Sequence, residues 1–411
     1  SIYGGFSCPV ASNVDAGPAG EWTYNAAVHA VVAPLTGSAL TVTGATNKVV
    51  ISDVDLTAAD ATVPGTSSIG AIVATSTDVT LLRVKVTAGN GAKGTDVTVA
   101  GMVGADGPDP ANPKAGEPAV SAAKDAVCSA DATTQVGATW ANATACNSRG
   151  GAGGTAIAGV AASGGNGTAG QPMVNLVDMS IGTGGPGGPV ANSMLGGMDG
   201  SGGLPGAPGS AASALGTFSD TGFTSASGSP GADGYTGQGG GGGGASAGAS
   251  GCAGASGGVG GMGGCGGLHA AAGTGGGASI ALLSWSSGVV LNTVQLVAAT
   301  GGDGGRGGNG GQGGNGQGGT LGGVGVGPIV AGGGGGRGGN GGDGGAGSGG
   351  TGGPSFALAS HGTKPTEIGQ ITATAVAGGK AGKGGAAATN ASVAAADGKV
   401  GTAQPRFEIV P

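Results

Sequence analysis

The residues best suited to chemistry are three acidic side chains, Asp53, Asp55 and Asp60, on a short stretch of predicted β-structure. A polysaccharide lyase or hydrolase would use such carboxylates as acid and base, or to hold calcium. Alternation along a strand puts Asp53 and Asp55 on one face, opposite the apolar Val54 and Leu56. We therefore expect solvated acids rather than a catalytic pair, and no metal site or cofactor.

The three histidines, His29, His269 and His361, each lie among small residues. No Ser-His-Asp or Cys-His set for nucleophilic catalysis can be assembled around them from the sequence. No phosphate-binding G-x-x-x-x-G-K-S/T motif occurs, and G-x-G-x-x-G matches are trivial in a glycine repeat. The sequence thus predicts a protein that is not an enzyme.

The five cysteines are far apart and contain no C-x-x-C pair, which argues against a zinc site. Low charge and abundant Ser, Thr and Asn instead favour a secreted protein with disulfides. Cys128, Cys146, Cys252 and Cys265 are the candidates, and their connectivity stays open. Cys8 is the odd cysteine, which we expect to be buried, or paired with a removed segment or a neighbouring subunit.

Glycines at every third position from 248 to 266 restrict which cysteines can form a disulfide with each other. A straight polyproline-II-type segment at ~3.1 Å per residue would hold Cys252 and Cys265 about 40 Å apart. Either the chain turns near Gly257 and Gly258, or each cysteine ties its segment to another one, such as the segment that holds Cys128.

The composition is unlike that of an ordinary globular domain, with 107 glycines in 411 residues and only 9% charged residues. A net charge of −7 disfavours nucleic acid and anionic membrane surfaces as partners. No apolar run reaches the roughly 18 residues of a membrane span. Because the sequence starts at Ser1 without a signal region, we expect a mature processed chain, or a fragment of a longer one.

Glycine triplets dominate two stretches, 301–319 and 335–353, with polar residues at the third positions. A period of three with two bare positions suits polyproline-II-type helices, which need neighbours to share their backbone hydrogen bonds. Several such helices must therefore bundle. If these two ran parallel and in register, Asp303 would face Arg337.

Three stretches, 71–91, 279–305 and 356–385, share one pattern of apolar strand, polar turn, second strand and glycine-rich excursion. Recurring short strands separated by turns are typical of a solenoid. We therefore expect an all-β protein with polyglycine-II. Its fold would be a right-handed parallel β-helix with the glycine-rich helices bundled alongside.

We divide the chain into four parts at composition shifts. They are N-terminal coils (1–100), an irregular Pro/Ala-rich insert with Cys128 and Cys146 (101–170), a coil with a long glycine-rich block (171–278), and coils with two glycine excursions and a C-terminal strand (279–411). Glycosylation sequons occur at Asn142, Asn166 and Asn390.

The start SIYGGF, followed by cysteine and tryptophan, and the strand units ending in GG-x-GG-x-GG resemble secreted β-helix surface proteins of myxobacteria and similar bacteria. The glycine repeats are similar to the polyglycine-II bundles of snow-flea antifreeze proteins and phage tail-tip adhesins. These resemblances imply an extracellular location and a binding or structural role, and they supply no functional residues.

The chain ends suggest how such a protein could assemble. Residues 406–410 alternate as a strand, and an uncapped solenoid end recruits another copy. We expect Phe407 and Ile409 to enter the core of a neighbouring copy, which makes the chain a structural subunit of an extracellular filament or surface layer. The main alternative is a monomeric adhesin that binds glycans or a receptor. An ice-binding protein or a polysaccharide-degrading enzyme has less support.

Overall fold

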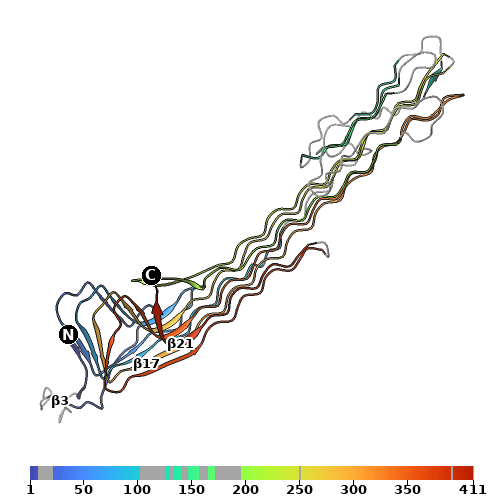
Figure 1. Cartoon of the computed structure of the whole chain (residues 1–411). Coiled ribbons are helices and arrows are strands. Elements are labelled where there is room, and N and C mark those ends of the chain that lie inside the picture. The colour runs from blue at the N-terminus through green and yellow to red at the C-terminus, as the bar shows by residue number, and fades with distance from the viewer. Residues whose placement is uncertain are drawn as a thin grey trace, which may run out of the picture.

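The computed structural model describes residues 1–7, 22–101, 126–128, 134–139, 147–156, 165–171, 196–249, 251–389 and 392–410. Over these ranges the chain forms strands, turns and extended segments, and no helix. It has a head of β-sheets, which carries both termini, and a long shaft of glycine-rich segments that projects from the head (Figure 1).

Three five-stranded parallel sheets make up the head. The first sheet has the order β1 (Ile2–Tyr3), β6 (Val49–Ser52), β9 (Val79–Leu82), β16 (Val289–Asn292) and β19 (Thr366–Ile368). The second has the order β20 (Thr372–Ala377), β17 (Gln295–Thr300), β10 (Lys85–Thr87), β7 (Val54–Thr57) and β4 (Ala30–Val32). The third has the order β21 (Ala403–Ile409), β18 (Ser355–His361), β15 (Ser279–Trp285), β8 (Ser68–Ala74) and β5 (Leu40–Thr43).

Three antiparallel pairs complete the strands of the described chain. They are β2 (Phe6–Ser7) with β3 (Thr23–Tyr24), β11 (Val127–Cys128) with β14 (Cys252–Ala253), and the hairpin of β12 (Gly216–Ser219) and β13 (Gly222–Ser225).

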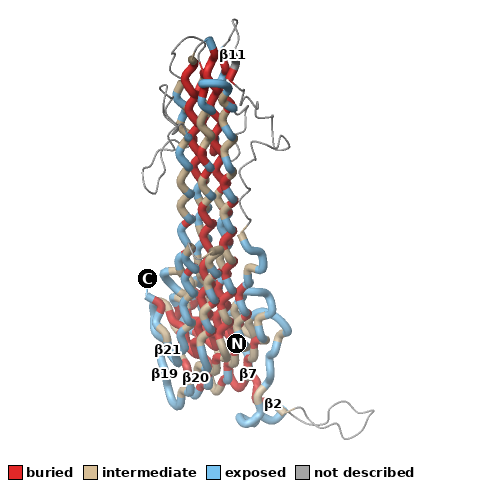
Figure 2. The backbone as a smooth tube through the Cα atoms, turned by 90° about the vertical axis from the view of Figure 1, so that its right-hand side faces the viewer, coloured by how far each residue is buried: buried red, intermediate tan, exposed pale blue. Residues whose placement is uncertain are grey.

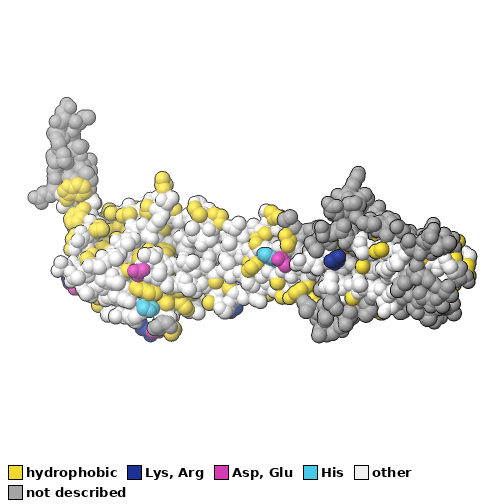
Figure 3. All heavy atoms as spheres, turned by 90° about the horizontal axis from the view of Figure 1, so that it is seen from above, with side chains coloured by type: hydrophobic (Ala, Val, Ile, Leu, Met, Phe, Trp, Pro, Cys, Tyr) yellow, Lys and Arg dark blue, Asp and Glu magenta, His cyan; other side chains and the backbone are white. Residues whose placement is uncertain are grey.

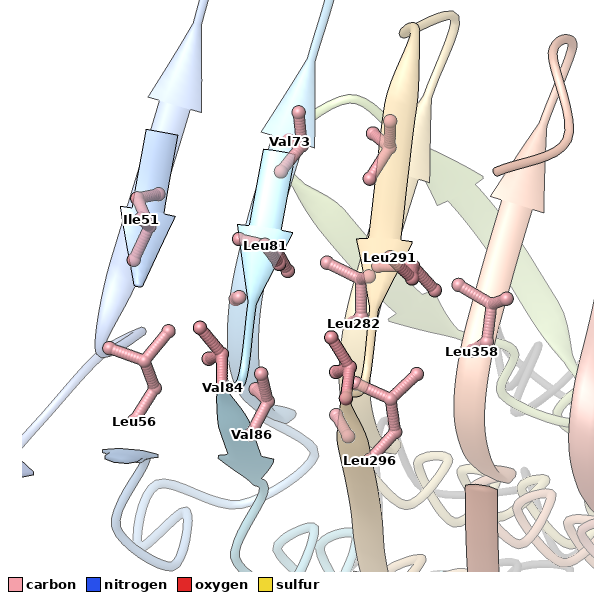
Figure 4. Packing of buried hydrophobic residues seen from close by; sticks show 14 of the residues in the cluster. Ile51, Leu56, Val73, Leu81, Val84, Val86, Leu282, Leu291, Leu296 and Leu358 are labelled. Atoms are coloured by element: carbon pink, nitrogen blue, oxygen red, sulfur yellow. The ribbon is translucent and has the colours of Figure 1, made fainter. Parts of the chain in front are cut away.

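One apolar core lies between the three sheets (Figure 4). Residues paired across neighbouring strands form rows of like side chains, and Ile51, Leu81 and Leu291 are one such row in the first sheet. Each of the three is at most 1% exposed. Burial of one such side chain contributes about 1.5–3 kcal/mol, so the rows stabilise the head.

Single residues in the left-handed conformation join the first sheet to the second. Asp53 (φ 57°), Arg83 (φ 51°) and Thr293 (φ 54°) each occupy this corner, and Gly369 (φ 71°) continues the column. The corners are linked by backbone hydrogen bonds, such as that from Arg83 N–H to the Asn292 carbonyl at 2.9 Å. The conformation costs a non-glycine residue about 1–2 kcal/mol, which the sheets on either side must offset.

The expected β-helix with glycine helices bundled alongside is wrong. The strands form separate parallel sheets of five strands, and the glycine segments prolong the strands instead of covering the side of a solenoid (Figure 1). The reason lies at the junctions. Strand β17 ends at Thr300 and the triplets begin at Gly301, so no turn redirects the chain.

Extended segments form the shaft, and the described stretches 134–139, 147–156 and 165–171 are hydrogen-bonded to it in addition to the segments that follow. These segments are residues 91–101, 197–209, 229–247, 254–277, 301–323, 332–353, 378–386 and 395–401. Buried residues run along the inside of the shaft and exposed ones along its outside (Figure 2).

Segment 332–353 shows how the shaft is held together. In its Gly-Gly-X triplets, the N–H of the first glycine donates to segment 301–323, as in Gly338 N–H to Gln317 O at 2.8 Å. The N–H of the second glycine of a triplet donates to segment 229–247, as in Gly339 N–H to Gln238 O at 2.8 Å. Its carbonyls accept from segments 254–277 and 197–209. Four neighbours thus satisfy the backbone of one segment, as ordered glycine requires.

The residue numbers of bonded partners run in opposite directions in segments 301–323 and 332–353. These segments are therefore antiparallel, and the predicted facing of Asp303 and Arg337 is wrong. Asp303 instead accepts a hydrogen bond from the Lys380 N–H at 2.7 Å, and Asp199 accepts one from the Arg337 N–H at 2.7 Å. Acidic residues at the third position of a triplet thus accept hydrogen bonds from backbone N–H groups of neighbouring segments. In both of these cases the N–H belongs to a basic residue.

Replacing Asp303 by alanine should lower the free energy of unfolding by about 1 kcal/mol, because the Lys380 amide loses its acceptor. Asn at this position keeps an acceptor oxygen and should lose less than half as much. Chemical denaturation of both variants measures the difference. Equal losses in the two variants would contradict a role for the side-chain oxygen.

The C-terminal strand has its partner within the chain, which removes the reason for expecting it to pair with a neighbouring copy. Strand β21 pairs in parallel with β18 from Ala403 to Ile409, and Ile409 is only 9% exposed. The partner strand β18 precedes β21 by only one excursion of the chain.

Charged side chains close the core at this end of the head. Arg406 continues an inward row that holds Leu358, and Glu367 continues one that holds Leu291. The two form a bidentate ion pair, with both N–O distances 2.8 Å. Inward charges on edge strands hinder pairing with further strands. The end that the sequence suggested to be uncapped therefore has a polar cap.

Candidate functional site

Most of the aromatic side chains of the head gather on the outer face of the third sheet. The chain has 11 aromatic residues, and Phe218, Phe223, Trp285, Phe356 and Phe407 all belong to this one cluster. Such a concentration in a chain that is 3% aromatic marks this face as the candidate site.

Two sources place these rings together. Strand alternation turns Phe356 of β18 and Phe407 of β21 outward, where their rings stack with centroids 4.3 Å apart. The β12–β13 hairpin lies over the sheet and adds Phe218 and Phe223, which are paired across its two strands with centroids 4.9 Å apart. Phe218 lies 5.8 Å from Phe407, so hairpin and sheet share one aromatic cluster.

A second stack lies beside the first. Trp285, His361 and Ile409 are paired across β15, β18 and β21, and so form one row. The rings of Trp285 and His361 stack with centroids 4.0 Å apart and an angle of 14° between planes. The Ser286 hydroxyl lies 3.4 Å from His361 Nδ1.

Between the hairpin and the sheet edge lies a groove of about 650 Å³. The four phenylalanines and Trp285 line it, and Thr217, Gln404, Glu408 and His361 bring polar groups to it. We call this the aromatic groove. Its size is within the range of about 300–1,000 Å³ for small-ligand sites, and its mixture of rings and a few polar groups is typical of them.

The aromatic groove contains both proposed assembly residues. Phe407 is half-buried against Phe356 and Phe218, and Ile409 is buried in the same cluster. Their apolar surfaces are thus used within the chain. Sequence reasoning missed the hairpin, although Phe218 and Phe223 flank Asp220-Thr221-Gly222, a turn signal that could have revealed it.

The acidic residues are arranged differently from the prediction. Asp53 is 1% exposed, and its carboxylate accepts hydrogen bonds from Arg83 (2.6 Å and 2.9 Å), Ser52 (3.0 Å) and Tyr24 (3.1 Å). The Arg83 guanidinium is the main cause that lowers the pKa of Asp53. The positive φ of Asp53 breaks the strand alternation between Asp53 and Asp55, and the expectation of a solvated acid depended on that alternation.

Asp55 and Asp60 also have partners. The Asp55 carboxylate lies 2.7 Å from His29 Nδ1, and Asp60 accepts a hydrogen bond from the Asn90 amide at 2.6 Å. His269 lies 2.7 Å from Asp233, whose pKa is lowered by hydrogen bonds from the His269 backbone and ring. Two of the histidines that looked isolated in the sequence, His29 and His269, thus pair with acids distant in the chain.

Two of the cysteine candidates, Cys252 and Cys265, are each disulfide-bonded. The segment between them is extended and keeps its hydrogen-bonding period, so it does not turn near Gly257. Cys128 pairs with Cys252 in the β11–β14 register. Cys8 and Cys146 lie outside the described residues, as do the sequons at Asn142 and Asn390.

Comparison with protein-family models, curated proteins and solved structures finds no match. Within the described ranges, His, Cys, Asp and Glu side chains do not gather in threes as a metal site would require. In the same part of the chain we find no helical segment with the length and hydropathy of a membrane span.

Proposed function

We propose that this chain is an extracellular adhesin that binds carbohydrate in the aromatic groove of its head. The observation that carries the proposal is the groove itself, where aromatic rings and polar side chains line one cavity of about 650 Å³. Pyranose rings have apolar C–H faces that pack on aromatic rings and hydroxyl groups around their edge. Thr217, Gln404 and Glu408 are suited to hydrogen-bond such hydroxyls.

The shaft suits a protein that must keep its shape outside a cell. Segment 254–277 has 24 residues, which at ~3.1 Å per residue extend over about 75 Å. Its backbone is bonded to neighbours on several sides, so bending would break many hydrogen bonds together. Disulfides at Cys252 and Cys265 fit an oxidising, extracellular location.

The filament hypothesis loses its main support at the C-terminal end of the head. Head-to-tail stacking would set the edge strand β5 of one copy beside β21 of the next. The row of Leu40 would then meet Arg406, which already binds Glu367. Covering this ion pair with apolar side chains costs several kcal/mol of desolvation. The adhesin hypothesis needs no such contact.

Replacing Phe407 by alanine should weaken carbohydrate binding about tenfold or more, because the ring forms part of the groove wall. The measurement is calorimetric titration with a panel of soluble cello-, malto- and chito-oligosaccharides, followed in parallel by intrinsic tryptophan fluorescence, to which Trp285 contributes. Thermal unfolding of the variant shows whether the head is still folded.

Tyr235→Ala is the matched control, since Tyr235 is an exposed aromatic residue on the shaft, outside the groove. It should bind as the unchanged protein does. Absence of saturable binding across the panel, or equal affinity in the Phe407 and Tyr235 variants, would overturn the proposal.

A further inference from the structure

At the end of the head opposite the charged cap, the described residues are mostly apolar and leave the outer sides of the edge strands unpaired. Strands β1, β4 and β5 are the edge strands of the three sheets at this end, so each sheet presents unpaired backbone groups there. We call it the N-terminal end. Exposed sheet edges of this kind pair readily with another chain.

The inward rows end here on apolar residues. Ile2 continues the row of Ile51, and Val32 continues the row of Leu56. Ile2 is 50% exposed and Val32 is 40% exposed, although their neighbours in the rows are buried. Val31, on the outer face of β4, is 68% exposed. Within the described residues, no further side chain continues these rows on this side. Figure 3 shows hydrophobic side chains on one face of the head.

Charge is sparse among the described residues of this end. Lys48 is the single Lys, Arg, Asp or Glu in the 29 residues from Trp22 to Val50. The opposite end holds Lys364, Glu367, Arg406 and Glu408 in two ion pairs. An apolar surface with open strand edges needs a partner of the same kind. The charged end also has edge strands, but its inward rows end on the Arg406–Glu367 ion pair.

We propose that the N-terminal end is a dimer interface that binds the same end of a second copy. The contact is isologous, because each copy offers the other an identical apolar row and identical open edges. A twofold axis makes facing edge strands antiparallel, an arrangement that sheets accept as readily as parallel pairing. The charged cap then faces outward in both copies, and the assembly stops at two.

The test uses the full chain in sedimentation velocity from low to high concentration. The unchanged protein should reach twice its chain mass of 36.7 kDa and no more. The double substitution Val31→Lys and Val32→Lys puts charge on the β4 edge, as the other end has naturally, and should raise the dimer Kd at least tenfold. Both residues are exposed in the single chain, so the head should still fold.

Val376→Lys is the matched control, because Val376 is 62% exposed on the edge strand β20 at the charged end. It should leave the dimer intact. A protein that is monomeric at every concentration, a dimer that survives the double substitution, or one that Val376→Lys dissociates would each overturn the proposal. Growth beyond two copies would also overturn it.

If the double variant unfolds, Val31→Lys alone serves the same test. Carbohydrate binding by the monomeric variant distinguishes this interface from the aromatic groove.

Discussion

Gly339→Val should destabilise the shaft by about 3 kcal/mol or more, and Gly339→Ala should already cause most of this loss. Gly339 lies in the middle of segment 332–353, and its N–H donates to the Gln238 carbonyl. A Cβ at this position would overlap the Ser201 carbonyl of segment 197–209. Since that contact is with backbone, the segments must separate and lose hydrogen bonds on both sides.

Thermal unfolding and limited proteolysis measure this effect. Gly318→Ala is the matched control, because a Cβ at residue 318 meets no other atom within 4 Å and the residue lies in a neighbouring shaft segment. The control should resemble the unchanged protein in both experiments. If the Gly339 variants were as stable and as resistant to protease as the control, the close packing of the shaft would be refuted.

Asp53→Asn should lower the free energy of unfolding by about 3 kcal/mol at neutral pH. The substitution removes the charge that binds Arg83 but keeps a residue that tolerates the left-handed conformation found at this corner. Asparagine keeps one acceptor oxygen, so Arg83 loses the acceptor of one of its two hydrogen bonds, and the NH2 group that replaces the other oxygen is itself a donor. Urea unfolding of the two proteins gives the difference.

Acid should remove this difference. The pKa of Asp53 is lowered in the folded state, chiefly by Arg83, so its stabilising effect is complete above the pKa of the unfolded chain, about pH 4. It is lost as the pH falls through the lower, folded-state pKa. The stabilities of Asp53→Asn and the unchanged protein should therefore converge below about pH 4. A constant gap down to pH 2 would contradict the ion-pair explanation.

Much of the strand content could be predicted from the sequence. Alternating apolar residues in 279–300 and 355–377 correspond to strands β15 to β20, since burying one side of an extended chain imposes a period of two. The period of three in the glycine triplets likewise appears in the hydrogen bonds of the shaft. Both signals are local, so a single sequence contains them.

Features that depend on distant parts of the chain could not be predicted. Thr293 is a β-branched residue in a left-handed corner, where local preference would place glycine or asparagine. Asp53 is buried because Arg83 and Tyr24 reach it from other strands. The antiparallel direction of segments 301–323 and 332–353 follows from the path of the chain out of the head and back, which their repeats do not specify.

That path also constrains how the molecule can fold. Leu81 pairs with Leu291 in the head, but the chain between them runs out along the shaft and returns. Closing a connection of about 200 residues costs roughly 3 kcal/mol more entropy than closing one of about 10. Strands β4 to β10 lie close together in the sequence and can assemble early, whereas β15 to β21 depend on ordered glycine segments. We therefore expect slow folding. The N-terminal half of the head can complete its core only after the hydrogen bonds between the shaft segments have formed.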